Sequence, residues 1–467
     1  MKRIYLLAMA ATIFAGGCRK IEVDGTTTVV NNSGGTTENT ILEGRISENR
    51  TLKAQYTYKL RGLVYVTNGA ILTIEPGTRI VGEAGKNGGL IITRSCKIIA
   101  DGTVDKPIVF TSESATPQRG DWAGLVLLGN APTNSSFNGV QGIGEIEGGI
   151  NNSDGLGLYG TPATQQQNPA DNSGILRYVR IEYAGYAFLP DKEINGLTMG
   201  GVGNQTIIDY VQVSYANDDS FEWFGGTVNC KHLIAYKGLD DDFDCDNGYA
   251  GKVQFGIALR DSAIADISGS NGFEVDNDAN GSTLTPQTSA VFSNMTVIGP
   301  RATLANVGNS NFKRGMHLRR NCAISIFNSV IMGWPTGWLL DASTGRPTDL
   351  NINATGMVIA NTILAGNSGS FSYTASVATP TGWTTADVTN YFNRAGGGNT
   401  VLTNCSDVSL SAGFKYDNSV DFNPAVASPA LSGAAFTDAK LTGFTNVSYR
   451  GACSGSDTWW KNWTRYF

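Results

Sequence analysis

A motif of acidic and aromatic residues recurs along the chain, and this repetition constrains the fold more than any other feature. The segment DDSFEWFGG (218–226) aligns with DDDFDCDNG (240–248), and NGFEVDND (271–278) continues the same register. Further repeats pair RYVRIEYAG (177–185) with DYVQVSYAN (209–217), and relate SNMTVIG (293–299), NSVIMG (328–333) and NTILAG (361–366). Repeats of about 20–35 residues are typical of a solenoid, in which each coil buries its apolar face against the next.

The segments between the repeats are those of an all-β chain. Apolar runs such as GLVYV (62–66) and KPIVFTS (106–112) are too short for helices and are bounded by glycine, proline and asparagine. The 58 glycines favour many turns, and the unequal repeat length is explained by loops inserted at the coil corners. A propeller would need a steadier period of about 40–45 residues. The sequence therefore predicts a parallel β-helix, as a single domain over residues 42–467.

Side-chain alternation along a strand orients the acidic residues, because successive residues point to opposite faces. The side chains expected to point inward are those of Phe221, Trp223, Phe243, Cys245, Phe273 and Val275. Two outward ladders result, the first from Glu222, Asp244 and Glu274 and the second from Phe224, Asp246 and Asp276. Neighbouring coils lie about 4.7–4.9 Å apart, so the stacked carboxylates are expected to repel one another.

The next coil offers one way to offset this repulsion. In RGMHLRRN (314–321), Met316 and Leu318 take the inward positions, while His317 and Arg319 take the outward ones. We therefore expect a charge-pairing ladder, in which His317 and Arg319 neutralise part of the acidic ladder without a metal.

A bound cation is the second way. Calcium takes about six to eight oxygen ligands with flexible geometry, which clustered aspartates supply. The predicted ligands are Glu222, Asp240, Asp241, Asp242, Asp244, Asp246, Glu274 and Asp276. DNDANG (276–281) matches the first half of an EF-hand loop, but Gln287 stands where that loop needs glutamate. The alternative is an aspartate-rich turn that accepts hydrogen bonds from nearby backbone amides.

Catalysis is the main alternative to a binding role. A glycoside hydrolase needs two carboxylates, and the available candidates are Glu222, Asp241, Asp244 and Glu274. A polysaccharide lyase would need calcium and a basic residue such as Arg319. However, the only histidines, His232 and His317, lack the Gly-His-Gly context of polygalacturonases, and no GxSxG, phosphate-loop or HExxH motif is present. We expect a protein without catalytic residues.

Tryptophans offer a surface for sugars or a cover for the core. Trp334 and Trp338 lie in GWPTGW, and the C-terminal segment DTWWKNWTRYF (457–467) contains three more. Aromatic rings stack on sugars, so a glycan-binding surface is one interpretation. We favour the other for the C-terminal segment, a cap over the open end of the solenoid, because terminal coils need a cover.

The N-terminus has the layout of an export signal. Two basic residues precede an apolar stretch too short to span a bilayer, and small residues precede Cys18. This pattern resembles a bacterial lipobox, with Ala15 where leucine is usual; an ordinary signal peptide is the alternative. We expect a signal peptide at 1–17, lipidation of Cys18 and a flexible tether over 18–41.

The remaining six cysteines are at positions 96, 230, 245, 322, 405 and 453. An exported protein can form disulfides, and Cys405 with Cys453 is the pair we predict first, because both lie in the turn-rich C-terminal region. The alternative is that several are buried thiols that pack as small apolar groups. No CxxC spacing indicates a zinc site.

Together these motifs resemble a family of exported lipoproteins of Bacteroidota with a pectin-lyase-like, right-handed parallel β-helix. The resemblance runs from about residue 42 to the C-terminus and is carried by AILTIEPGTRIVG, KIIADGT with KPIVFTS, GDWAGLVLLG, FEWFGGTVN, LDDDFDCDNGYAGKVQFGIALRD, SGSNGFEVDND and VSYRGA. It implies the fold and a location on the outer membrane, but no established activity. Cys96, Cys245 and the tail after Cys453 depart from the family pattern.

These observations predict a lipid-anchored protein of the outer membrane, facing the cell surface with the periplasmic face as the alternative, that binds calcium and acts as a binding or structural protein. Its expected partners are the membrane, through the lipid, and a glycan or an outer-membrane protein. The net charge of −6 is spread along the chain without a basic stripe, which argues against nucleic acid as a partner. The alternative function is a polysaccharide lyase or glycoside hydrolase on the same scaffold.

Overall fold

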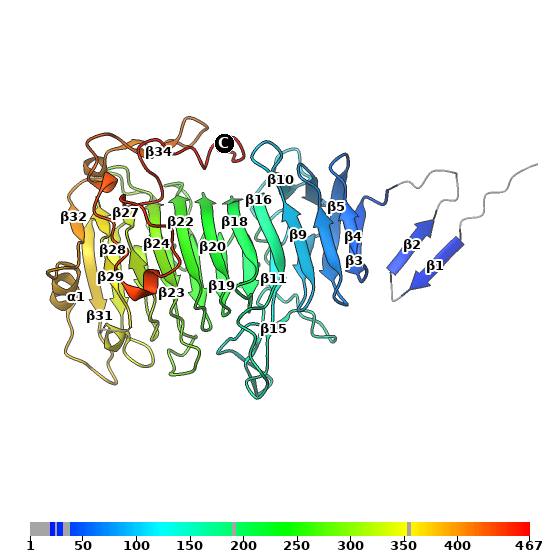
Figure 1. Ribbon diagram of the computed structural model, residues 1–467, viewed down its shortest axis with the longest axis horizontal. Helices are drawn as coiled ribbons and strands as arrows, with labels where there is room; N and C mark the ends of the chain where they lie inside the picture. The colour runs from blue at the N-terminus through cyan, green and yellow to red at the C-terminus, as the bar shows by residue number, and fades with distance from the viewer. Residues whose placement is uncertain (1–18, 24–25, 31–37, 189–192, 353–355) are drawn as a thin grey trace, which may run out of the picture.

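Short strands rich in aliphatic and aromatic residues pair in parallel with their counterparts one coil further along, and together they form a right-handed parallel β-helix (Figure 1). The computed structural model describes residues 19–23, 26–30, 38–188, 193–352 and 356–467, with side chains from residue 38 onward. The predicted signal peptide (1–17) and the lipidation site Cys18 lie outside the described residues. Among the described residues, no helix is long and apolar enough to cross a membrane.

Each coil contributes to three parallel sheets. The first is here called the ladder sheet. It begins with the second half of β3 (Ile41–Ile46), which pairs with the second half of β5 (Thr57–Val66). Its further strands are β8 (Gly89–Ile92), β11 (Leu125–Leu128), β17 (Leu197–Gly200), β19 (Phe221–Phe224), β21 (Phe243–Asp246), β23 (Phe273–Val275), β25 (Arg314–Leu318), β28 (Thr336–Asp341) and β31 (Gly369–Thr374).

The second and third sheets share five long strands: β16 (Gly174–Glu182), β18 (Ile207–Ser214), β20 (Asn229–Tyr236), β22 (Lys252–Leu259) and β24 (Val291–Ile298). Their first halves form the second sheet with β4 (Arg50–Leu52), β6 (Ile71–Ile74), β9 (Lys97–Asp101), β26 (Ser325–Phe327) and β29 (Ile359–Ala360). Their second halves form the third sheet with β7 (Arg79–Gly82), β10 (Ile108–Ser112), β27 (Val330–Met332), β30 (Ile363–Ala365) and β32 (Thr400–Leu402).

The remaining elements are short. Antiparallel pairs are formed by β1 (Arg19–Val23) with β2 (Thr26–Val30), by β12 (Ser136–Phe137) with β13 (Val140–Gln141), by β14 (Ile143–Glu145) with β15 (Leu158–Gly160), and by β33 (Leu410–Ala412) with β34 (Asp421–Pro424). The helices are α1 (Thr385–Phe392), η1 (Thr348–Asn351), η2 (Cys405–Val408), η3 (Pro429–Leu431) and η4 (Ala439–Leu441). Within the segment expected to be a flexible tether, β1 and β2 thus pair with each other.

The interior is packed by the side chains that alternation placed inward. Phe221, Phe243 and Phe273 are fully buried and stack along the axis, with ring centroids 5.8 and 5.3 Å apart. Trp334 and Trp338 are also fully buried in the core, so neither ring is available to stack on a sugar.

The C-terminal end of the solenoid is closed by α1 and not by the last residues of the chain. Phe392 of α1 is fully buried and contacts Phe371 and Trp338 of the last coils, at centroid distances of 5.1 and 6.5 Å. The predicted cap, residues 457–467, instead follows the flank of the solenoid (Figure 1), where Trp463 packs edge-on against Tyr178 and Tyr210. The aromatic rings of Tyr178 and Tyr210 would otherwise be exposed to solvent, so this flank needs a cover just as the open end of the solenoid does.

The predicted disulfide between Cys405 and Cys453 is not present. All six cysteines among the described residues are buried free thiols. The Sγ atom of Cys405 donates to the carbonyl of Arg301 at 3.2 Å, whereas Cys453 belongs to the C-terminal segment that contacts β24 through Ala452. A shared region of the chain does not bring two sulfurs into bonding geometry.

Candidate metal centre on the acidic ladder

The outward ladder forms on the ladder sheet as side-chain alternation requires. Glu222 of β19 is in register with Asp244 of β21, Asp244 with Glu274 of β23, and Glu274 with His317 of β25. The carboxylates are therefore adjacent along the axis, one for each coil. No described residue donates a hydrogen bond to the carboxylate of Asp244, the central member.

A second row of side chains lies two residues before each strand: Asn195, Asp219, Asp241 and Asn271. Each of the first three accepts a hydrogen bond through Oδ1 from the backbone N–H of the next member, at 3.2 Å for Asn195 and 2.7 Å for Asp219. This local bonding is the metal-free alternative raised by the sequence. It engages one oxygen of Asp219, while Asp241 also accepts at its second oxygen, Oδ2, from Nδ2 of Asn271 at 3.4 Å.

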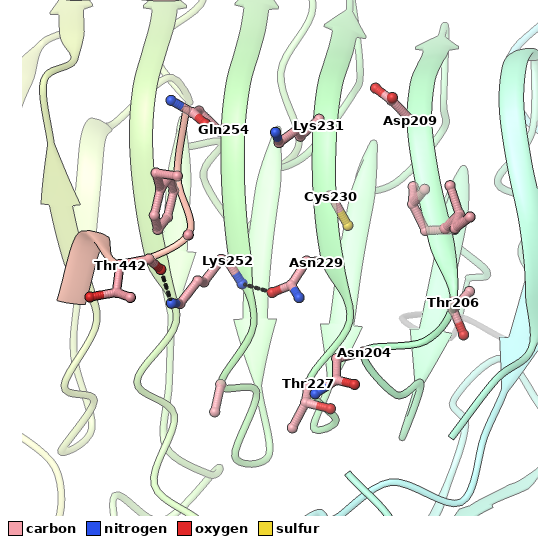
Figure 2. Close-up of a pocket in the computed structure, with 15 residues that line it drawn as sticks. Asn204, Thr206, Asp209, Thr227, Asn229, Cys230, Lys231, Lys252, Gln254 and Thr442 are labelled. Atoms are coloured by element: carbon pink, nitrogen blue, oxygen red, sulfur yellow. Dashed lines mark hydrogen bonds between the residues drawn. The ribbon is translucent and has the colours of Figure 1, made fainter. Parts of the chain in front are cut away.

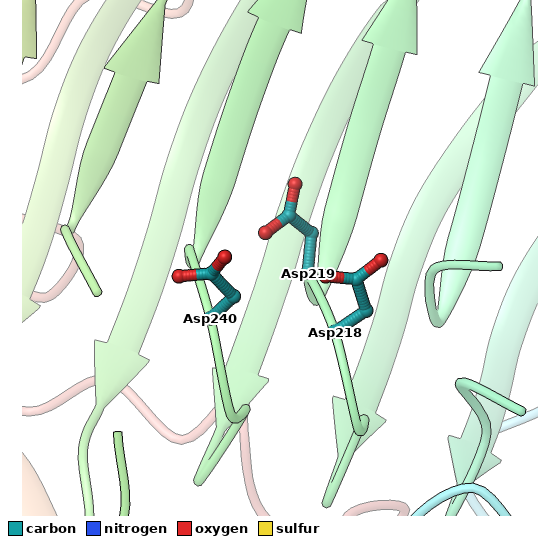
Figure 3. Close-up of side chains that lie close together, drawn as sticks. All are labelled: Asp218, Asp219 and Asp240. Atoms are coloured by element: carbon teal, nitrogen blue, oxygen red, sulfur yellow. The ribbon is translucent and has the colours of Figure 1, made fainter. Parts of the chain in front are cut away.

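The carboxylates of the two rows, together with Asp218 and Asp240, form three overlapping groups. One group comprises Asp218, Asp219 and Asp240, which Figure 3 shows leaning toward one another from the turns before β19 and β21. The others are Asp219 with Glu222 and Asp244, and Asp241 with Asp244 and Glu274. In each group, one oxygen of every residue lies within 4.8 Å of the others, and Asp219 and Asp244 each belong to two groups.

Burial and mutual repulsion disfavour the ionised form of these groups. Burial, followed by the charges of Glu147 and Asp244, raises the pKa of Glu222 well above its usual range. Burial and the charges of Asp266 and Glu274 raise the pKa of Asp240 to about 7. Binding a cation would remove this penalty, because an ion with two positive charges is a stronger partner than the protons it replaces.

Among the described residues, positive side chains contact the ladder at one end only. His317 contacts Glu274 at 3.1 Å, and Arg319 holds Asp276 through two bonds of 2.7 and 3.0 Å. Burial would raise the pKa of Glu274, but the His317 hydrogen bond and the Arg319 charge outweigh it and leave that pKa lowered. Arg320 also contacts Asp276, at 2.7 Å. The structure thus places His317 and Arg319 beside Glu274 and Asp276, at the C-terminal end of the acidic ladders.

The other end has no such partners. Among the described residues, no lysine, arginine or histidine lies within 4.0 Å of the carboxylates of Asp218, Asp219, Glu222 or Asp244. Thr198 is in register with Glu222, is fully buried, and its Oγ1 has no hydrogen-bond partner among the described residues. Oδ1 of Asp240 also has none. These orphaned oxygens, with the carboxylates, fit a hard cation such as Ca²⁺, which binds oxygen ligands.

Three other predicted ligands have separate environments. Asp242 lies apart from the three groups and forms an ion pair of 2.9 Å with Arg260, with both side chains fully buried. Asp276 is held by arginines, as described above. Asp246 lies in the second ladder, in register with Phe224, and burial and the charge of Asp276 raise its pKa to about 8.

A cleft of 560 Å³ adjoins the ladder sheet. The insertion between β11 and β16 supplies Phe137 and Tyr159 to its lining, and β19 supplies Phe224. Glu147, which also lines the cleft, hydrogen-bonds Glu222 and so joins the cleft to the carboxylate groups. Aromatic rings beside polar groups are the usual lining of a small-ligand site.

Sequence reasoning missed several residues of this site. Asp218 and Asp219 align with Asp240 and Asp241 in the repeat, so the alignment contained the signal that places them in the cluster. Thr198 could have been found by extending the register back one coil. Glu147 carries no such signal, because it belongs to an insertion outside the repeat.

Comparison with known families agrees with this architecture. The family model for the pectate-lyase-like beta helix domain matches residues 44–408, which include every strand that bears the acidic ladder. A search of curated proteins finds no match to the chain.

Proposed function

The chain belongs to the pectate-lyase-like β-helix domain family, and from that premise we propose that it is a calcium-dependent binding protein for acidic glycans. The observation that carries the proposal is the set of overlapping carboxylate groups on β19, β21, β23 and the turns before β19 and β21. Among the described residues, these groups have cationic partners only at the Glu274 end. Calcium is held by Asp218, Asp219, Glu222, Asp240, Asp241, Asp244 and Glu274, with Thr198 nearby.

An acidic glycan suits the surroundings of that cation. A net-negative ladder repels an anion, so a uronate can approach only when a divalent ion neutralises the carboxylates and bridges to it. The cleft beside the ladder then supplies the partly exposed Phe137, with the 8% exposed Phe224, for contacts with the apolar faces of sugar rings, whereas Tyr159 is fully buried. Among the residues that the structure describes, none with a positive side chain lines this cleft.

The calcium proposal is tested by thermal unfolding with calcium and with a chelator. Binding to the folded state adds about 2.7 kcal/mol to the unfolding free energy at about a hundredfold excess of ligand over Kd. We expect calcium to raise Tm for the wild type by several degrees, and Asp244→Asn to lose most of this shift. Glu48→Gln, at an exposed site remote from the ladder, should keep the full shift. An unchanged wild-type Tm would refute a calcium site.

The glycan proposal is tested by titration with oligogalacturonate. We expect a component of binding that calcium induces and that the cleft variant Phe137→Ala weakens. Equal binding with calcium and with chelator would contradict a bridging role for the cation.

Hydrolysis of a glycan on the same residues is the second candidate function. Burial and neighbouring charges raise the pKa of Glu222, so that a protonated carboxyl lies beside further carboxylates, the pair of groups that a glycoside hydrolase needs. A lyase reaction with Arg319 as the base is disfavoured, since Glu274 and Asp276 already engage that guanidinium. Depolymerisation of an acidic polysaccharide by the wild type, lost in Glu222→Gln, would replace binding with catalysis.

The location proposed for this activity is the outer membrane, facing the cell surface. Lipidation of Cys18 would anchor the β-helix there, close to extracellular glycans and to outer-membrane proteins. The support is the order of basic, apolar and small residues before Cys18.

A further inference from the structure

A second groove lies on the second sheet, a different sheet from the one that bears the acidic ladder. It has a volume of 570 Å³, and its floor is formed by the first halves of β18, β20 and β22 (Figure 2). The segment 442–444, which follows η4, forms one wall. This volume is in the range of ligand pockets. None of the carboxylates assigned to calcium lines it.

The groove has two ammonium groups that lack anionic partners. Lys231 donates to Oγ1 of Thr445 at 3.0 Å, and Lys252 donates to the carbonyl of Thr442. Neither Nζ atom lies within 4.0 Å of a carboxylate among the described residues. Because an ammonium has three N–H donors, each lysine retains two for a ligand. In a chain of net charge −6, two lysines in one groove that form no ion pair with a described residue provide a local site for an anion.

Neutral polar groups surround these lysines. Oδ1 of Asn229 accepts from the backbone N–H of Lys252 at 3.0 Å, which leaves the Nδ2 donors of Asn229 available. The exposed Asn204 presents a second carboxamide at the same end of the groove (Figure 2). Carboxamides donate to and accept from hydroxyl groups, which is the chemistry that sugars require.

Apolar surface completes the lining. Ile207 is 40% exposed on the floor, and the ring of Phe444 forms part of the wall, with Nζ of Lys252 5.7 Å from its centroid. The contact with Lys252 holds the wall against the floor. Among the described residues, one carboxylate lines the groove, that of Asp209, which is in register with Lys231 and contacts Nδ1 of His232 at 2.7 Å.

We propose that this groove binds an anionic saccharide directly through Lys231 and Lys252, without a metal ion. The lysines bind the carboxylate or sulfate group, the carboxamides bind hydroxyls, and Phe444 and Ile207 contact the ring. A nucleic acid would need a longer basic surface than two lysines, and a protein partner would need a larger apolar area. This site goes beyond the calcium-dependent function and does not depend on it.

The test is calorimetric titration of the full chain in EDTA with three probes: tetragalacturonate, its fully methyl-esterified form, and a sulfated galactose tetrasaccharide. We expect one or both anionic probes to bind and the neutral ester not to bind. Lys231→Met and Lys252→Met keep the aliphatic stem and remove the charge, so each should weaken binding by about fivefold or more, and the pair should abolish it. Lys86→Met, at an exposed turn, is the matched control and should bind as the wild type does.

Three results would overturn the proposal. They are no binding of either anionic probe in EDTA, equal binding of the neutral ester, and unchanged affinity in the double lysine variant with an unchanged Tm. Binding that appears only with calcium and is lost in Asp244→Asn would assign the saccharide to the ladder instead. That result would support the calcium-dependent function while refuting this one, so the two proposals fail separately.

Discussion

Asp244 lies between Glu222 and Glu274 in the ladder, where each coil adds another carboxylate. Burial and then the charge of Glu274 raise its pKa well above the usual range. At residue scale the site is therefore destabilising when no cation is bound. A bound cation would offset the repulsion between these carboxylates and so stabilise the folded protein.

The first prediction concerns pH. A carboxyl group whose pKa is raised on folding binds more protons in the folded than in the unfolded state, so its contribution to stability falls as pH rises between the two pKa values. With the unfolded value near 4 and Asp246 at about 8 in the folded protein, we expect Tm in EDTA to decrease from about pH 4 to about pH 8. Differential scanning fluorimetry across this range measures it.

Calcium and an amide variant serve as controls for the pH prediction. Saturating calcium should reduce the decline of Tm, and Asp246→Asn should make the decline shallower because the amide does not titrate. A Tm in EDTA that is constant or rises over the same range would contradict the raised pKa values.

The second prediction concerns Asp242, which the sequence grouped with the metal ligands. Its pair with Arg260 is fully buried, and the guanidinium also donates to the carbonyl of Leu239 at 2.9 Å. Removing one partner strands a buried charge, so Arg260→Met should lower the unfolding free energy by about 3–5 kcal/mol. The double variant Arg260→Met with Asp242→Leu should recover part of this loss. Denaturant unfolding measures both variants. An Arg260→Met variant with an unchanged unfolding free energy would show that the Arg260–Asp242 pair does not stabilise the fold.

At the scale of elements, one backbone feature separates the second sheet from the third. Tyr178, Tyr210, His232 and Phe255 occupy equivalent positions in successive long strands and have positive φ values of 48°, 55°, 50° and 64°. Their rings stack with centroids 4.4, 4.2 and 5.2 Å apart. Left-handed backbone disfavours these residue types, so the stacking and the C-terminal segment that covers it stabilise the corner.

The third prediction concerns α1, the element that closes the solenoid. Phe392→Ala removes a fully buried ring between Phe371 and Trp338, which should cost about 3–5 kcal/mol locally. Because coils of a solenoid contact mainly their neighbours, hydrogen exchange should accelerate in β28 and β31 but not in β19 and β21. Val377→Ala, at a residue 96% exposed, is the control. Uniform acceleration along the whole chain would show instead that the coils unfold as one unit.

At the scale of the whole molecule, the β-helix separates two surfaces of opposite charge. The ladder sheet presents carboxylates beside an aromatic cleft, and the second sheet presents the lysine groove. A long solenoid permits this because each sheet repeats its own outward residues along the axis. Under the two proposals above, one acidic glycan chain would meet a metal-dependent and a metal-independent surface on the same protein.

The fourth prediction concerns attachment of the molecule to a membrane. Lipidation of Cys18 would add the apolar chains that hold a protein on a bilayer, so Cys18→Ser should move the protein from the membrane fraction to the soluble fraction of a Gram-negative host. Cys453→Ser, at a buried position far along the chain, should leave the fractionation unchanged. Labelling with radioactive palmitate gives an independent readout, and an unlabelled, soluble wild type would disprove the anchor.

Prediction from the sequence succeeded where the structure is periodic. The register of Phe221 with Phe243 and Phe273 followed from aligned repeats, and strand alternation then gave the outward direction of Glu222 and its equivalents. It did not succeed for residues in turns. Asp242 precedes its strand by one residue, and its partner Arg260 directly follows the end of β22, so no alternation rule applied to the pair.

The sequence by itself determined the stacking of coils and the outward carboxylates, because a repeated strand pattern with a period of two residues leaves one register that buries the apolar face. Only the tertiary structure decided which oxygens share a site, since the conformation of the turns before β19 and β21 sets which carboxylates meet, and an insertion outside the repeat adds Glu147. It also decided that α1 closes the end, that the last residues cover the aromatic flank, and that Lys231 and Lys252 meet in one groove. Those contacts depend on the paths of loops and chain ends, which no local periodicity encodes.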